Sequence, residues 1–173
     1  RCSVSSQTSP ISSTRFVDRR MRTARRLSPV RSTMNRTLLD TDILSEVFKR
    51  RDANVEAKAN AYLAEHGRLT LSSITVLEVV RGYRRVGREA KVESFERALT
   101  DCEVLPIDEA AGRIAGRIYA DLETRGRPIG MPDVMIAAIA LRNGIVLATG
   151  NVSHFEFVVA AGYPLTFDNW RMV

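Results

Sequence analysis

Residues 37–42 of this 173-residue chain are Thr-Leu-Leu-Asp-Thr-Asp, a short apolar run that ends in a carboxylate. The run predicts a buried strand at 37–39, and a helical pattern follows it at 43–49. Asp40 therefore comes directly after a strand and just before a helix. Because ligands of open α/β sheets bind outside the carboxyl ends of the strands, Asp40 stands where a binding site is expected.

The alternation of strands and helices continues to the end of the chain. Apolar runs predict further short strands at 69–71, 103–105 and 145–148, and a weaker one at 165–167. The helical patterns cover residues 43–49, 54–65, 74–84, 91–99, 110–125 and 132–143. Such an alternation predicts an α/β fold with a short, mostly parallel central sheet flanked by helices.

The first 33 residues differ in composition from the rest of the chain. They contain eight arginines, no lysine and one acid, Asp18, which leaves 18 basic and 19 acidic residues in 34–173. The net charge of +6 therefore belongs to the N-terminal segment and does not argue that the body binds nucleic acid. This Arg- and Ser-rich segment predicts disorder. We interpret it as sequence upstream of a true start at Met34, in preference to a mitochondrial transit peptide, so that 34–173 form one domain.

Composition also excludes several classes of protein. No apolar stretch of about 18 residues is present, so no membrane span is predicted. Cys2 and Cys102 are too few and too far apart for a disulfide framework or a zinc–thiolate site, which favours a reducing, cytoplasmic location. His66 and His154 are the only histidines, so any metal is expected to be a hard cation on oxygen ligands.

Glu78 is a single acid inside the apolar run Ile74-Thr75-Val76-Leu77-Glu78-Val79-Val80, within the predicted helix 74–84. A carboxylate among buried neighbours needs a compensating charge. A bound cation would supply that charge, and so would an i,i+3 ion pair with Arg81 on an exposed edge. Both explanations stay open at this point.

Asp133 follows Pro132 in the first turn of the predicted helix 132–143, whose continuously apolar remainder indicates burial against the sheet. An acid in a first turn also stabilises a helix without any further function. A similar competing explanation applies to Asp40 and Asp42, either of which would serve as an N-cap of the helix that follows them, 43–49. The capping role is the stronger explanation for Asp42 than for Asp40.

A polar turn is expected where the strand 145–148 ends. It contains Thr149 and Asn151, and His154 and Glu156 follow. Asn151 is suited to orienting a metal-bound water and Glu156 to adding a carboxylate, although both are explained equally well as ordinary loop residues. His154 is interpreted as structural or exposed, and not as catalytic.

These acids come from different strand ends of one predicted sheet and are expected to converge. Three carboxylates in one pocket repel one another and so need a cation, for which oxygen ligation selects Mg²⁺ or Mn²⁺. Such a cation would activate a water and stabilise charge on a phosphodiester, which is nuclease chemistry.

Four blocks together resemble the VapC toxins of the PIN-domain superfamily. They are Leu-Leu-Asp-Thr-Asp at 38–42, Ser-Ser-Ile-Thr-Val-Leu-Glu-Val-Val-Arg-Gly at 72–82, Gly-Arg-Pro-Ile-Gly-Met-Pro-Asp-Val-Met-Ile-Ala-Ala at 126–138 and Thr-Gly-Asn-Val-Ser-His-Phe at 149–155. The resemblance implies a three-layer α/β/α fold. It further implies metal-binding catalytic residues Asp40, Glu78 and Asp133, a homodimer, a cognate VapB antitoxin, and cleavage of structured RNA, often transfer RNA.

One departure from the family pattern concerns the last block, where many PIN domains carry a fourth acid and this chain has Asn151. The resemblance then implies Glu156, directly after Phe155, as the substitute carboxylate. It also leaves open a site with one metal, or one completed by RNA phosphates.

Three other functions compete with that of a nuclease. Asp40-Thr41-Asp42 after a strand also resembles the nucleophile motif of haloacid dehalogenase-type phosphatases. That motif requires a Thr or Val two places after the second Asp and a catalytic lysine further along the chain. Here Leu44 fills the first place and no lysine follows Lys91. A receiver domain would also use clustered acids near strand ends, but it too requires a late lysine, which this chain does not have. The third alternative is a non-catalytic or weakly catalytic binding module, in which the acids serve only a protein partner. Arg81, Arg84 and Arg85 are candidate RNA contacts, with a solvated helix face as their simpler explanation.

Overall fold

The computed structural model describes residues 34–172, so the predicted N-terminal extension lies outside the described residues. Its elements alternate along the chain as β1 (Thr37–Leu39), α2 (Thr41–Lys49), α3 (Ala53–His66), β2 (Thr70–Ser72), α4 (Ser73–Arg85), α5 (Glu89–Leu99), β3 (Glu103–Leu105), α6 (Glu109–Thr124), α7 (Met131–Asn143), β4 (Val146–Ala148), α8 (Val152–Ala160) and β5 (Phe167–Asp168). The α/β prediction is confirmed.

The five strands form one parallel sheet in the order β3-β2-β1-β4-β5. β1 and β4 are paired through their full length, with Leu39 opposite Ala148. The ladder continues one residue further, because the backbone N–H of Asp40 donates to the carbonyl of Ala148 at 2.9 Å. The segments that follow β1 and β4 therefore start side by side at the same edge of the sheet.

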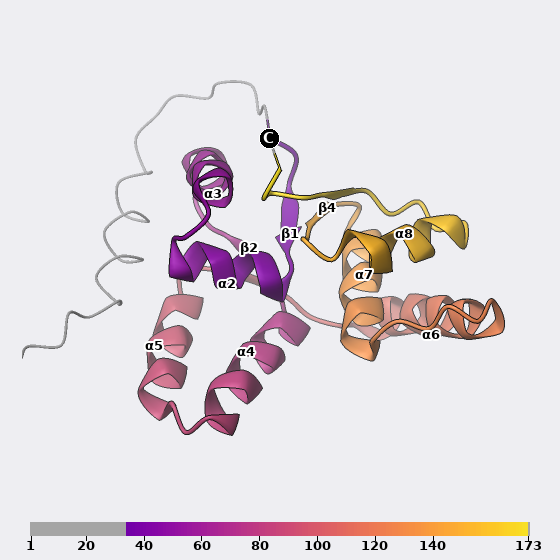
Figure 1. The fold of residues 1–173 in the computed structure, drawn as a ribbon, viewed down its shortest axis with the longest axis horizontal. Coiled ribbons are helices and arrows are strands. Elements are labelled where there is room, and N and C mark those ends of the chain that lie inside the picture. The colour runs from indigo at the N-terminus through magenta and orange to yellow at the C-terminus, as the bar shows by residue number, and fades with distance from the viewer. Residues whose placement is uncertain (1–33, 173) are drawn as a thin grey trace, which may run out of the picture.

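Helices cover both faces of the sheet, which gives three layers (Figure 1). Leu38 and Leu147 pack on one face in a cluster with side chains of α6, α7 and α8. Leu39 and Ala148 pack on the other face with side chains of α2, α3 and α5. Because both faces are buried at the centre of the sheet, the neighbouring strands β1 and β4 carry apolar residues at successive positions instead of alternating ones.

The segment after Asn151 contains a helix that we did not predict. Residues 149–151 lie outside the helices and strands, as the predicted polar turn requires. Residues Val152–Ala160, which we expected as loop, form α8, whose Phe155 and Val158 are buried in the first core cluster. The last strand also begins later than predicted, at Phe167. Among residues 34–172, none of the helices combines the length and apolar character that crossing a bilayer requires.

Candidate active site

Asp40 is a buried carboxylate held by two donors at the end of β1. It is the N-cap of α2, and its Oδ1 accepts from the backbone N–H of Thr41 at 2.7 Å. Its Oδ2 accepts from the hydroxyl of Thr149 at 2.8 Å, and the residue is only 5% exposed. Burial raises the pKa of Asp40 to about 7, and the charges of Asp42 and Asp133 add to this rise, while the hydrogen bonds from Thr149 and Thr41 oppose it.

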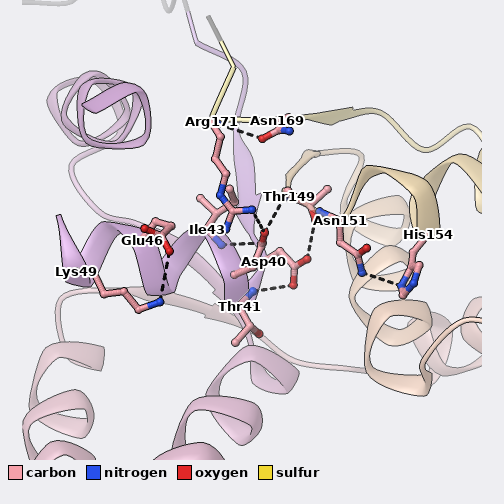
Figure 2. A network of polar contacts seen from close by, with 12 residues as sticks. Asp40, Thr41, Ile43, Glu46, Lys49, Thr149, Asn151, His154, Asn169 and Arg171 are labelled. Carbon is pink, nitrogen blue, oxygen red and sulfur yellow. Dashed lines mark hydrogen bonds and ion pairs between the residues drawn. The ribbon is translucent and has the colours of Figure 1, made fainter. Parts of the chain in front are cut away.

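Thr149 connects Asp40 to the loop that follows β4. Its backbone N–H donates to the carbonyl of Asp168 in β5 at 3.0 Å, which anchors the strand end. Its hydroxyl accepts from the backbone N–H of Asn151 at 3.0 Å while donating to Asp40. Figure 2 shows this chain of contacts running from Asp40 through Thr149 to Asn151.

Asp133 lies in the first turn of α7 and faces two side chains from the start of α8. Its Oδ2 is 2.7 Å from Nδ1 of His154 and 3.5 Å from Nδ2 of Asn151. Asn151 and His154 also contact each other, at 2.7 Å (Figure 2). The side chain of Asp133 is 21% exposed and that of His154 is 39% exposed. This group is therefore more open to solvent than Asp40.

Glu78 is half-buried on α4 and reaches the site through Thr41, whose hydroxyl donates to its Oε2. Thr41 also donates its backbone N–H to Asp40, so one residue connects the two carboxylates. The alternative ion pair between Glu78 and Arg81 is not found among the described residues. The structure thus places Glu78 toward Asp40.

Asp42 lies beside the site, but its carboxylate oxygen Oδ2 already has two partners within the protein. Its Oδ2 accepts from the backbone N–H of Gly150 at 2.9 Å and pairs with Nη1 of Arg171 at 3.2 Å. A Cβ added to Gly150 would lie 2.1 Å from that Nη1, so this contact needs glycine. Asp42 therefore ties the C-terminal segment to the loop after β4.

Glu156 is not brought to the other predicted site residues. It is exposed on α8, and in the part of the chain that the structure describes no hydrogen bond joins it to them. Residues two positions apart in a helix differ by about 200° around its axis. Glu156 and His154 therefore project from different sides of α8. The helix that we did not predict is the reason for this separation.

The donor chemistry of the site fits a hard divalent cation. Asp133 is close enough to Asp40 for its charge to contribute to the raised pKa of Asp40. No three His, Cys, Asp or Glu side chains within 34–172 form a ready group of metal ligands. Mg²⁺ does not need such a group, because it is typically held by one or two carboxylates, with waters and substrate phosphates as further ligands. Asp40 and Asp133 are suited to that mode, with Glu78 next to them.

Three residues with direct contacts to the predicted site were missed by our sequence reasoning: Thr41, His154 and Arg171. Thr41 and Arg171 carry no pattern that indicates their contacts. The segment around His154 did carry one, because Phe155 and Val158 have the i,i+3 spacing of a buried helix face. A helix there would have placed Asn151 and His154, three residues apart, on neighbouring positions.

Comparisons with known proteins agree with this architecture. A family model described as PIN domain matches residues 37–156. The chain is 32% identical over 126 residues to a tRNA(fMet)-specific endonuclease VapC of Shigella flexneri, covering 72% of this chain and 93% of that protein. It is also 32% identical over 138 residues to Ribonuclease VapC2 of Haemophilus influenzae, covering 79% and 99%. The solved structure of VapBC-1 from nontypeable Haemophilus influenzae superposes with a TM-score of 0.67 at 28% identity, covering 79% of this chain and 98% of that one.

Proposed function

Since the chain belongs to the PIN-domain family, and within it to the VapC ribonucleases of toxin–antitoxin systems, we propose that it is a Mg²⁺-dependent endoribonuclease of the cytoplasm that cleaves structured RNA. The observation that supports the proposal is the hydrogen-bond chain at the carboxyl end of the sheet that joins Asp40 through Thr149 and Asn151 to Asp133. Glu78 reaches Asp40 through Thr41. Mn²⁺ is expected to substitute for Mg²⁺. Transfer RNA is the first substrate to test, because one relative is named for its action on it.

The side chains divide the work of such a site. Asp40 and Asp133 would hold the cation, with Glu78 as a third carboxylate. When bound, Mg²⁺ supplies positive charge and lowers the pKa of a coordinated water. Thr149 and Thr41 hold the Asp40 carboxylate through the two hydrogen bonds that favour its ionised form. Asn151 lies beside Asp133, with its backbone N–H held by Thr149, and would orient a polar ligand.

We further propose two protein partners: a second copy of this chain and a VapB-like antitoxin. A solved VapBC complex of the same fold supports the antitoxin. The body, 34–173, has near-zero net charge, so RNA affinity would depend on local groups, and the exposed Arg81, Arg84 and Arg85 that follow Glu78 on α4 are the candidates.

The test is cleavage of transfer RNA by the purified chain in Mg²⁺, in Mn²⁺ and in EDTA, with Asp40→Ala and Asp133→Ala as variants. We expect cleavage in both metals, none in EDTA, and a loss of about 10²-fold or more in each variant, the scale of removing a key electrostatic contact. Unchanged cleavage by both folded variants would show that the site is wrong. Cleavage that persists in EDTA would refute metal dependence.

A further inference from the structure

His154 makes the shortest side-chain contact of Asp133. Its Nδ1 lies 2.7 Å from Oδ2 of Asp133, whereas the amide of Asn151 is 3.5 Å from the same oxygen. Among the described residues no hydrogen bond reaches Oδ1 of Asp133. One carboxylate oxygen is thus engaged by α8, and the other is left for a further ligand.

The direction of this hydrogen bond follows from the chemistry of its two partners. An ionised carboxylate only accepts, so Nδ1 of His154 must carry the ring hydrogen and donate it. The carboxamide of Asn151 lies 2.7 Å from the same ring nitrogen, and rotation of that amide by half a turn presents its oxygen to the same hydrogen. Both neighbours are then compatible with a donating Nδ1.

The side chain of Asp133 needs such a partner because the main chain at the start of α7 does not hold it. Its backbone belongs to the first turn of α7, whose N-cap is Gly130 and makes no side-chain cap hydrogen bond. Asp40, in contrast, is held by the main chain of Thr41 and by a strand end. The rotamer of Asp133 is therefore determined by side chains of α8 and not by the backbone around it.

We propose that His154 is a positioning residue for Asp133, donating from Nδ1 to Oδ2 so that Oδ1 is presented to the divalent cation. The inference rests on the proposed function, because the cation belongs to that site. Partners of this kind fix the orientation of metal-binding carboxylates, and their loss typically costs about 10–100-fold in metal affinity. Neither a fourth acid nor Glu156 is then needed on this side of the site.

The experiment measures Mn²⁺ binding to the full chain by calorimetry, without RNA, for the wild type and three variants. His154→Ala removes the donor and His154→Asn restores a donor close to the place of Nδ1 without the ring. Ser153→Ala, at an exposed position one residue away on α8, is the matched control. Thermal unfolding of each variant without metal establishes that it folds.

We expect His154→Ala to weaken Mn²⁺ binding by about 10–100-fold, His154→Asn to recover most of that loss, and Ser153→Ala to bind as the wild type does. Wild-type affinity in a folded His154→Ala variant overturns the inference. So does a His154→Asn variant as weak as His154→Ala, because the ring and not the Nδ1 donor would then be required. A wild-type chain that binds no Mn²⁺ overturns it as well. A wild type that binds Mn²⁺ but cleaves no RNA refutes only the proposed function.

Discussion

Asp40 and Asp133 occupy the same edge of the sheet, yet the protein holds them by different means. Asp40 is 5% exposed, and its two oxygens accept from a backbone N–H and from a threonine fixed at a strand end. The side chain of Asp133 is 21% exposed, and its neighbours are two side chains from another helix. The parallel sheet itself therefore positions Asp40, whereas Asp133 depends on side chains that are individually replaceable.

Because of this difference, ionisation in the absence of a cation costs more free energy at Asp40 than at Asp133. Burial without a cation raises the free energy of ionised Asp40, which is why its pKa rises to about 7. The more exposed Asp133 keeps contact with water and avoids much of that cost. Substitutions are expected to affect stability mainly at Asp40 and metal geometry mainly at Asp133.

The largest expected effect on stability is the pH dependence of the metal-free protein. The pKa of Asp40 is about 7 in the folded state, against an ordinary value of 3.8, so the folded state binds more protons between these values. The contribution of Asp40 to the free energy of unfolding must then fall as the pH rises through this window, by at most about 1.4 kcal/mol per pH unit. Asp40→Asn removes this dependence, and asparagine keeps the N-cap.

Urea unfolding in EDTA at pH 5, 6 and 7 measures this contribution as the difference between wild type and Asp40→Asn. Asp133→Asn is the matched comparison: it removes only the smallest of the effects on the pKa of Asp40, so its slope should stay close to that of the wild type. If the slopes of wild type and Asp40→Asn were equal, Asp40 would not be the buried, high-pKa carboxylate that the structure shows.

Thr149→Val comes next in expected size. It removes the hydroxyl that donates to Asp40 at 2.8 Å while keeping the shape of the buried side chain. Hydrogen bonds to charged groups are worth about 1.5–3 kcal/mol, so we expect RNA cleavage to fall about tenfold or more at neutral pH. Steady-state cleavage rates measure the loss, and Thr149→Ser, which keeps the hydroxyl, is the control. Equal rates for the two variants would show that the hydroxyl does not support Asp40.

Arg171→Ala tests the tie between the C-terminal segment and the loop after β4. The ion pair with Asp42 is partly exposed, so its loss should lower the free energy of unfolding by no more than about 1 kcal/mol. Arg113→Ala, which breaks an exposed pair with Glu109 on α6, is the control with the same change of charge. Denaturant unfolding compares the two, and an equal loss in both would mean that Arg171 is an ordinary surface arginine.

Glu156→Gln should have the smallest effect. Glu156 is exposed on α8 and makes no hydrogen bond to the predicted site residues that the structure describes. We expect its RNA cleavage rate to stay within about twofold of wild type, since exposed substitutions usually cost less than about 0.5 kcal/mol. Asp133→Asn should lose far more in the same assay. A loss as large as that of Asp133→Asn would establish Glu156 as the fourth acid after all.

The sequence by itself determined the architecture. Strands that must be buried on both faces carry apolar runs, and the run at 37–39 matches β1 residue for residue. The predicted strand at 103–105 also matches β3, the partly buried edge strand, residue for residue. The position of Asp40 at a strand end follows from the same local pattern. These features depend on the period of the side chains along a short segment, which is visible without any tertiary contact.

Only the tertiary structure decided which side chains complete the site. The residues from Val152 begin a helix because Phe155 and Val158 are buried beneath it, and that helix turns His154 toward Asp133 while leaving Glu156 exposed. Arg171 reaches Asp42 from a segment 129 residues away in the chain, at 3.2 Å. Local periodicity at 155–158 indicates the helix itself, but the distant side chains that a helix meets depend on how the helices pack on the sheet. The contacts with Asp133 and Asp42 therefore leave no local pattern in the sequence.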